Sequence, residues 1–110
     1  MDGCVFCNIG RGEIKTDFIF KDEEIMAFND INPSAPVHIL IVPIRHLASV
    51  SNLSDEDKDL AGKMLLKARD IAKERNLDGY KLIFNVGRTG GQIVDHLHLH
   101  LLSGKSIRMP

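Results

Sequence analysis

The chain has 110 residues, of which 44% are hydrophobic and 26% are charged, and its formal net charge is −1 at pH 7. This size and composition suit one compact domain over residues 1–110, and the near-neutral charge argues against a duplex-binding surface, which needs an excess of Lys and Arg. The longest apolar run, residues 37–44, is too short to span a bilayer. We therefore expect neither nucleic acid nor a membrane as a partner.

The N-terminal segment combines an acidic start with a C-x-x-C pair. Because residues 1–3 lack the cationic region of a signal peptide, we expect a cytoplasmic protein. Cys4 and Cys7 fit a structural disulfide, a redox couple, half of a zinc site or two ordinary thiols. A bridge here would close too small a loop to constrain the unfolded chain, and the βαβ context of a redox motif is missing. Half of a zinc site and reduced thiols remain, and zinc needs two further ligands.

The next segments have the composition of strands separated by turns. Residues 17–21 and 24–29 predict a β-hairpin around a turn-like acidic pair. Two prolines then interrupt regular structure, and the apolar run 37–42 predicts a central, well-covered strand. His38 lies near the start of that strand, where it is either a hydrogen-bonded core histidine or part of a site.

A long amphipathic helix is predicted to begin at Ser54. Ser54 and the three acidic residues after it have the pattern of a helix N-cap, where the helix dipole favours negative charge. We expect the helix to end at Lys73 and Arg75, with Gly79 beyond them as a stop. Apolar residues recur at helical spacing and form one stripe that needs a sheet to cover: Leu60, Ala61, Met64, Leu65, Ala68, Ile71 and Ala72.

Residues 80–86 predict a fourth strand, which leads into the glycine-rich loop 87–92. Glycines let backbone N–H groups approach a ligand closely, and a loop that presents such donors can cradle a phosphate. The same composition is also typical of an ordinary hairpin turn.

Three of the five histidines fall within residues 96–102, where histidine alternates with leucine. Strict alternation has the period of a β-strand, whose successive side chains point to opposite faces. We therefore predict a strand with His96, His98 and His100 on one face and leucines packed under a helix on the other. Histidines can decorate a solvated face without a task, but nothing about solubility requires a row of three.

These features together favour phosphorus chemistry. A neutral imidazole in the middle of the row is a competent nucleophile, and covalent catalysis divides one hard displacement into two easier steps. Amides of the glycine loop, the Asn85 side chain and a neighbouring imidazole would stabilise the charged phosphate oxygens.

The run from His96 to Leu102 matches the signature of the histidine-triad (HIT) family, in which histidines alternate with hydrophobic residues. The preceding residues 85–95 resemble that family's Asn-x-Gly-x-x-Gly-Gln-x-Val run, and residues 28–46 resemble its Hint branch. Because these motifs occur in the family's order and cover nearly the whole chain, the chain is identified by resemblance as a Hint-like HIT protein.

The resemblance implies an α+β fold with a five-stranded, mostly antiparallel sheet, one long helix and a short N-terminal helix. It implies a hydrolase of purine nucleoside 5′-phosphoramidates, with aminoacyl adenylates as further substrates. In such an enzyme His98 attacks the α-phosphorus and forms a nucleotidyl-histidine that water then cleaves. His100 would contact the phosphate, and His38 and His96 would set protonation or orientation. No catalytic metal is implied.

The resemblance also implies a purine nucleotide site. Its base pocket would be apolar and Asp30 would bind the ribose hydroxyls, an arrangement that suits a nucleoside. Without the resemblance, each pocket residue is equally an ordinary core residue. The implied pocket residues are Phe6, Ile9, Ile14 and Phe28. The other implied contacts are Asn29, Ile31, Asn85, Gly91, Gln92, Val94, His98 and His100.

The same resemblance implies a zinc site and a dimer. Some relatives in the wider family join an N-terminal C-x-x-C pair to two histidines, which here makes a Cys2His2 zinc site of Cys4, Cys7, His46 and His96. Such a closed tetrahedral site is structural, since no position is open for water; the alternative is reduced, metal-free thiols. The family also forms symmetric dimers, so we expect a homodimer.

Two other functions remain open. The first is a dinucleoside polyphosphate hydrolase, against which the Hint-like ending at residues 102–104 argues. The second is a nucleotide-binding or zinc-stabilised adaptor that does not need turnover. Three features depart from the family. Ile93 replaces a serine that many Hint proteins carry near the leaving group, and Lys15 follows Ile14 where the family often has proline. The tail 103–110 lacks a tryptophan found in some relatives.

Overall fold

The structure is a computed structural model that describes residues 3–104. It is an α+β fold with one five-stranded antiparallel sheet in the order β1-β2-β3-β5-β4, which confirms the predicted fold class. Most of the tail singled out above lies outside the described residues. The helices are α1 (Val5–Gly10) and α2 (Lys58–Glu74), and the strands are β1 (Phe18–Lys21), β2 (Ile25–Asn29), β3 (Val37–Pro43), β4 (Lys81–Ile83) and β5 (Leu99–Ser103).

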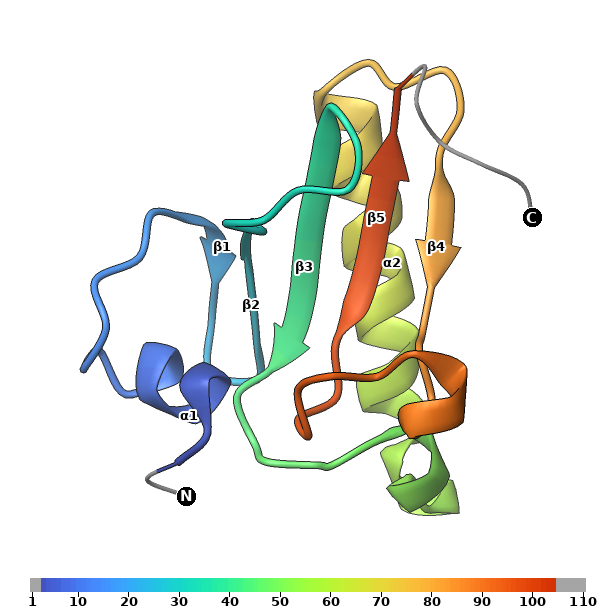
Figure 1. Ribbon diagram of the computed structural model, residues 1–110. Helices are drawn as coiled ribbons and strands as arrows, with labels where there is room; N and C mark the ends of the chain where they lie inside the picture. The colour runs from blue at the N-terminus through green and yellow to red at the C-terminus, as the bar shows by residue number, and fades with distance from the viewer. Residues whose placement is uncertain (1–2, 105–110) are drawn as a thin grey trace.

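The two faces of the sheet carry different residues. In Figure 1, α2 runs behind β3, β5 and β4 and covers that face of the sheet. Alternate residues of the central strands, such as Ile39 and Leu101, pair across β3 and β5 and lie in the core under α2. The intervening residues point to the other face, where His38 and His100 lie. Side chains from β2 and β3 pack there with Phe6 and Ile9 of α1. Strand alternation thus separates core from site.

Helix α2 ends near Lys73 and Arg75 as the sequence predicts, but it begins at Lys58, because the acidic residues after Ser54 form a 3-10 turn (Asp55–Asp57) ahead of it. Ser54 and Asp57 form a capping box ahead of the helix. The residue that stops the helix is Asn76 and not Gly79: Asn76 adopts φ +55° and the Leu77 amide donates to the Ala72 carbonyl, which closes the helix after Glu74. Asparagine tolerates this left-handed conformation. The stripe's buried members are Met64, Ala68, Ile71 and Ala72, whereas Leu65 is 43% exposed.

Two predicted strands are shorter than expected, for a shared reason. The strand at residues 96–102 begins only at Leu99, because the backbone before it leaves the sheet and the Leu97 amide donates to the Leu47 carbonyl. The strand at residues 80–86 pairs only over Lys81–Ile83, and residues from Asn85 onward would need partners before Leu99, where β5 has not yet begun. Among the described residues, no helix is long and apolar enough to cross a membrane.

Candidate functional site

The three alternating histidines lie in two different environments. Leu97, Leu99 and Leu101 are all buried in the core under α2, so the predicted alternation is confirmed. On the opposite face, the rings of His98 and His100 lie 4.8 Å apart between centroids. His96 instead joins the two N-terminal cysteines. Because β5 begins only at Leu99, the predicted row of three histidines is divided into the pair His98 and His100 and the separate ring of His96.

Backbone groups determine which nitrogen of His98 carries the proton. The His98 Nδ1 atom lies 2.7 Å from the carbonyl oxygen of His96. Because a carbonyl only accepts, Nδ1 is the donor, and the neutral ring keeps its lone pair on Nε2. The ring also packs edge-on against Phe6, 5.2 Å between centroids. In the neutral form of His98, Nε2 is therefore the nucleophilic atom.

A second backbone contact sets the neighbouring pair. The Ser34 amide donates to His38 Nδ1 at 2.9 Å, so the neutral His38 ring carries its proton on Nε2. His38 Nε2 donates that proton to His100 Nδ1, also at 2.9 Å. Asp30 Oδ2 lies 3.5 Å from His38 Nε2. His100 therefore accepts at Nδ1 and carries its own proton on Nε2. The site presents one imidazole acceptor beside one imidazole donor.

Burial keeps these rings neutral. Desolvation lowers the pKa of His38, although Asp30 opposes the shift. Desolvation, together with the charges of His98 and His38, lowers the pKa of His100 to about 4. Neutral rings at pH 7 are what the donor and acceptor assignments require.

A cavity of about 810 Å³ opens over these histidines. Its walls come from α1 and the segment after it, from β2 and β3 with the turn between them, and from the loop before β5. Predicted nucleotide-site residues that line it, besides His38, His98 and His100, are Phe6, Ile9, Ile14, Phe28, Asn29, Asp30, Ile31, Asn85, Gly91 and Val94.

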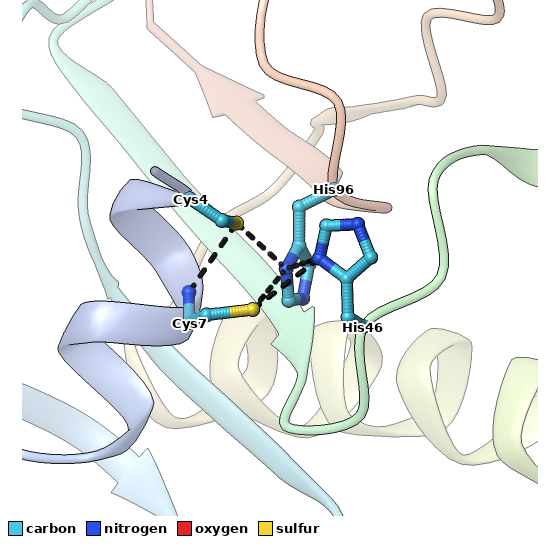
Figure 2. Close-up of side chains that lie close together, drawn as sticks. All are labelled: Cys4, Cys7, His46 and His96. Carbon is cyan, nitrogen blue, oxygen red and sulfur yellow. Dashed lines mark hydrogen bonds between the residues drawn. The ribbon is translucent and has the colours of Figure 1, made fainter. Parts of the chain in front are cut away.

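The two cysteines and two histidines form a compact cluster at the N-terminus of α1 (Figure 2). His96 Nδ1 lies 3.2 Å from Cys4 Sγ, 3.5 Å from Cys7 Sγ and 3.2 Å from His46 Nδ1. Cys7 Sγ lies 3.3 Å from His46 Nδ1, and all four donor atoms are within 4.8 Å of one another. Neither cysteine is in a disulfide.

These distances fit a tetrahedral zinc ion. Zn–S bonds of about 2.3 Å and Zn–N bonds of about 2.0–2.1 Å place neighbouring ligand atoms roughly 3.3–3.8 Å apart. His96 Nε2 lies 2.8 Å from the Pro43 carbonyl and donates to it, which leaves Nδ1 as the free ligand atom. Burial raises the pKa of the Cys7 thiol, so binding a metal there would displace a proton.

Comparisons with known proteins agree with this geometry. A family model described as "Scavenger mRNA decapping enzyme C-term binding" matches residues 3–109. Protein HitA of Neisseria gonorrhoeae is 45% identical over 103 residues, 93% of this chain and 96% of that protein. The chain belongs to the histidine-triad family.

Other HIT relatives match over similar lengths. A purine nucleoside phosphoramidase of Escherichia coli (strain K12) is 42% identical over 105 residues, 94% of this chain and 88% of that protein. A HIT family hydrolase from Legionella pneumophila has a TM-score of 0.93 at 44% identity, with 98% of each chain covered. A histidine-triad protein from Clostridium difficile also has a TM-score of 0.93, at 42% identity, and covers 100% of this chain and 96% of that one. The HIT fold is therefore shared over essentially the whole described chain.

Two features of the loop before β5 differ from our expectations. Gln92 does not line the cavity: its side chain is buried, accepts from the Gly87 amide and donates to the carbonyls of Ala48 and Val94. The amides of Gly90, Gly91 and Gln92 donate to carbonyls within the loop. Because these amides already donate to carbonyls of the turn, they do not form the predicted phosphate cradle. The Gln92 side chain holds the loop in place through its own hydrogen bonds.

The cavity of this HIT domain also contains residues that we did not assign to the nucleotide site. Leu40 follows His38 by two positions on one strand, so its place on the same face was readable from the alternation. Ile93, which is 84% exposed, was noted only as a departure from the family. No local signal marks the others, because the fold brings distant turns together: Val5, Lys15, Thr16, Asp17, Asn32 and Ser34.

The low pKa of His100 predicts a specific acid sensitivity. Its folded-state pKa of about 4 lies below the ordinary histidine value of 6.5, so as pH falls the unfolded chain takes up a proton before the folded one. Stability is then lost as pH drops from about 6.5 towards 4, by at most about 1.4 kcal/mol per pH unit.

Between pH 7 and pH 5, the free energy of unfolding of His100→Asn should fall by about 1 kcal/mol less than that of the wild type. This difference is smaller than the limit of about 1.4 kcal/mol per pH unit allows, because solvent screening weakens the effect. Denaturant unfolding of both proteins at the two pH values measures the difference. Both contain the Cys/His cluster, so its own acid sensitivity cancels. Equal pH dependence in the two proteins would contradict a depressed pKa at His100.

Proposed function

We propose that this HIT protein hydrolyses purine nucleoside 5′-phosphoramidates through a nucleotidyl-histidine. The observation that carries the proposal is the set of hydrogen-bond contacts of the cavity histidines, from which we assign a free lone pair to His98 Nε2 and an N–H donor to His100 Nε2 beside it. The name of the Escherichia coli relative, purine nucleoside phosphoramidase, supports the same reaction.

In the proposed first step, His98 Nε2 attacks the α-phosphorus while the P–N bond breaks. The leaving nitrogen takes a proton from solvent and departs as the neutral amine, and the water that attacks in the second step returns a proton to solvent. Attack makes the ring cationic, and the His96 carbonyl, which accepts the Nδ1 proton, stabilises that charge. His100 Nε2–H and the Asn85 side chain stabilise the charge on the phosphate oxygens. In the second step water cleaves the P–Nε2 bond, which releases the nucleoside monophosphate and restores the neutral ring.

The cavity walls suit a nucleoside. Phe6 and Phe28 pack edge-to-face at 5.8 Å and provide an apolar surface for a purine base. The Asp30 carboxylate accepts from the Asn32 amide through one oxygen, and its other oxygen faces the cavity side of His38 and is placed to bind ribose hydroxyls. Lys15 is the one cationic side chain that lines the cavity among residues 3–104, which favours a monophosphate derivative over a polyphosphate chain.

The Cys/His cluster is proposed to bind one structural zinc ion. Cys4, Cys7, His46 and His96 supply all four positions of a tetrahedral site, so the bound ion cross-links the N-terminus to the sheet and leaves no position for water or substrate. The steps proposed above therefore use groups of the protein and water, and none of them passes through this ion.

We also propose a homodimer. Strand β4 lies at one edge of the sheet, with Leu82 38% exposed. An edge strand offers unpaired backbone groups to a second copy of the chain. Size-exclusion chromatography with light scattering tests this assembly directly.

Turnover of adenosine 5′-phosphoramidate by the purified protein tests the proposed activity. We expect AMP and ammonia to form in equal amounts. A sample treated briefly with a mild chelator should retain activity. Diadenosine tetraphosphate serves as the matched comparison and is expected to react more slowly. If the protein binds AMP but releases no product from the phosphoramidate, the enzymatic proposal falls and a nucleotide-binding adaptor takes its place.

A further inference from the structure

One wall of the cavity belongs to a segment with little regular structure of its own. Helix α1 has six residues, and residues 11–17 reach β1 without a further helix or strand. A helix this short is not stable alone, because nucleation is costly and few hydrogen bonds follow it. Residues that face the cavity nevertheless recur along this N-terminal wall (residues 5–17): Val5, Phe6, Ile9, Ile14 and Thr16.

The Cys/His cluster ties this wall to the rest of the domain. Cys4 caps α1, with its sulfur 3.4 Å from the Cys7 amide, and Cys7 lies on the helix itself. Both sulfurs meet imidazoles from outside the wall: His46 follows β3, and His96 precedes β5 (Figure 2). The cluster therefore joins three segments that are far apart in the sequence.

The same cluster contacts the catalytic face through His96. Its ring belongs to the cluster, whereas its carbonyl accepts the Nδ1 proton of His98. Phe6 packs against both rings, 5.7 Å from His96 and 5.2 Å from His98 between centroids. Phe6 is also the wall residue that packs against Phe28 in the proposed base pocket. A change at the cluster thus reaches the base pocket through one side chain.

From these contacts we infer that the metal bound by the cluster is a positioning element for nucleotide recognition. The bound ion holds the N-terminal wall against the sheet, so that Phe6 and Ile9 form the base pocket, while the phosphate end of the cavity depends mainly on β3, β5 and the loop before β5. His96 acts as a positioning residue at the junction. Loss of the ion therefore weakens recognition of the base more than recognition of the phosphate. This inference rests on the proposed nucleotide site.

The test compares the wild type with a Cys4→Ser/Cys7→Ser variant, using AMP and ribose 5-phosphate, which lacks the base, as probes. Zinc content is measured by elemental analysis, affinities by calorimetry, and local order by amide hydrogen exchange of residues 5–17 against β3 as an internal reference. We expect about one zinc per wild-type chain and none in the variant. AMP affinity should fall at least tenfold, ribose 5-phosphate affinity less than threefold, and exchange should accelerate in the wall but not in β3.

Phe6→Ala is the matched control, because it removes the wall's central side chain and keeps all four cluster residues. It should lower AMP affinity selectively while zinc stays bound. Equal losses for both probes in the double variant, unchanged AMP affinity, unchanged exchange in the wall, or a zinc-free wild type would each overturn the inference. If the wild type binds no AMP, the proposed function fails, and the exchange comparison alone then decides whether the metal orders the wall.

Discussion

Replacing His98 with alanine is expected to reduce phosphoramidate turnover by at least about 10⁴-fold, the scale seen when a catalytic nucleophile is removed. The ring supplies the lone pair on Nε2, and no other imidazole in the cavity presents an unprotonated nitrogen in the described structure, since His38 and His100 use theirs as acceptors. AMP affinity should change less than about tenfold, because apolar contacts and ribose binding lie elsewhere. Single-turnover kinetics and calorimetry measure the two effects separately.

His98→Asn is the informative companion to this variant. An asparagine amide can replace the Nδ1–H donor to the His96 carbonyl, but it supplies no nucleophile. Equal inactivity of the alanine and asparagine variants would show that the lost lone pair matters. Substantial turnover by His98→Asn would instead mean that the ring serves only to hold the loop, and the covalent mechanism would be wrong.

Trapping the intermediate extends the same prediction. Acid-quenched wild-type protein should carry a nucleotide mass adduct on the peptide that contains His98, and neither variant should. Phosphoramidate bonds to histidine are acid-labile, so the quench must be brief.

Local patterns in the sequence predicted the parts of the fold that depend on alternation. Leucine alternation placed Leu97, Leu99 and Leu101 in the core, and the helical stripe placed Met64 and Ala68 opposite them. The strand limits were wrong where a distant segment competes for the backbone. The amide of Leu97 pairs with Leu47 instead of a neighbouring strand, and residues 45–49 carry no signal for that contact.

The candidate site shows the same division. Residue types and the family resemblance identified the histidines and most of the cavity residues, yet neither predicted that the loop amides would satisfy one another or that Gln92 would brace the loop. Those outcomes depend on which acceptors the folded chain brings near, as the carbonyl of Ala48 shows. The Cys/His cluster is similar, because 39 residues separate Cys7 from His46 and only the resemblance connected them in advance.

Removing the metal is expected to lower the thermal midpoint of the wild type by at least about 10 °C. A ligand present at 1,000 times its dissociation constant stabilises the native state by about 4 kcal/mol, and 1 kcal/mol shifts Tm by several degrees in a domain of this size. The stabilisation arises because the four ligands come together only in the folded chain, where they link α1 to the segments after β3 and before β5. Calorimetric scans with excess zinc and with a strong chelator measure the shift.

The double variant Cys4→Ser/Cys7→Ser is the control for this comparison. It should melt near the chelated wild type, and its Tm should not respond to zinc or to chelator, because two of the four ligands are missing. A wild-type Tm that is the same with zinc and with chelator would contradict a structural metal. A zinc response that persists in the double variant would place the metal elsewhere, and the pair of His38 and His100 with Asp30, whose donor atoms also lie within 4.8 Å, would be the next site to examine.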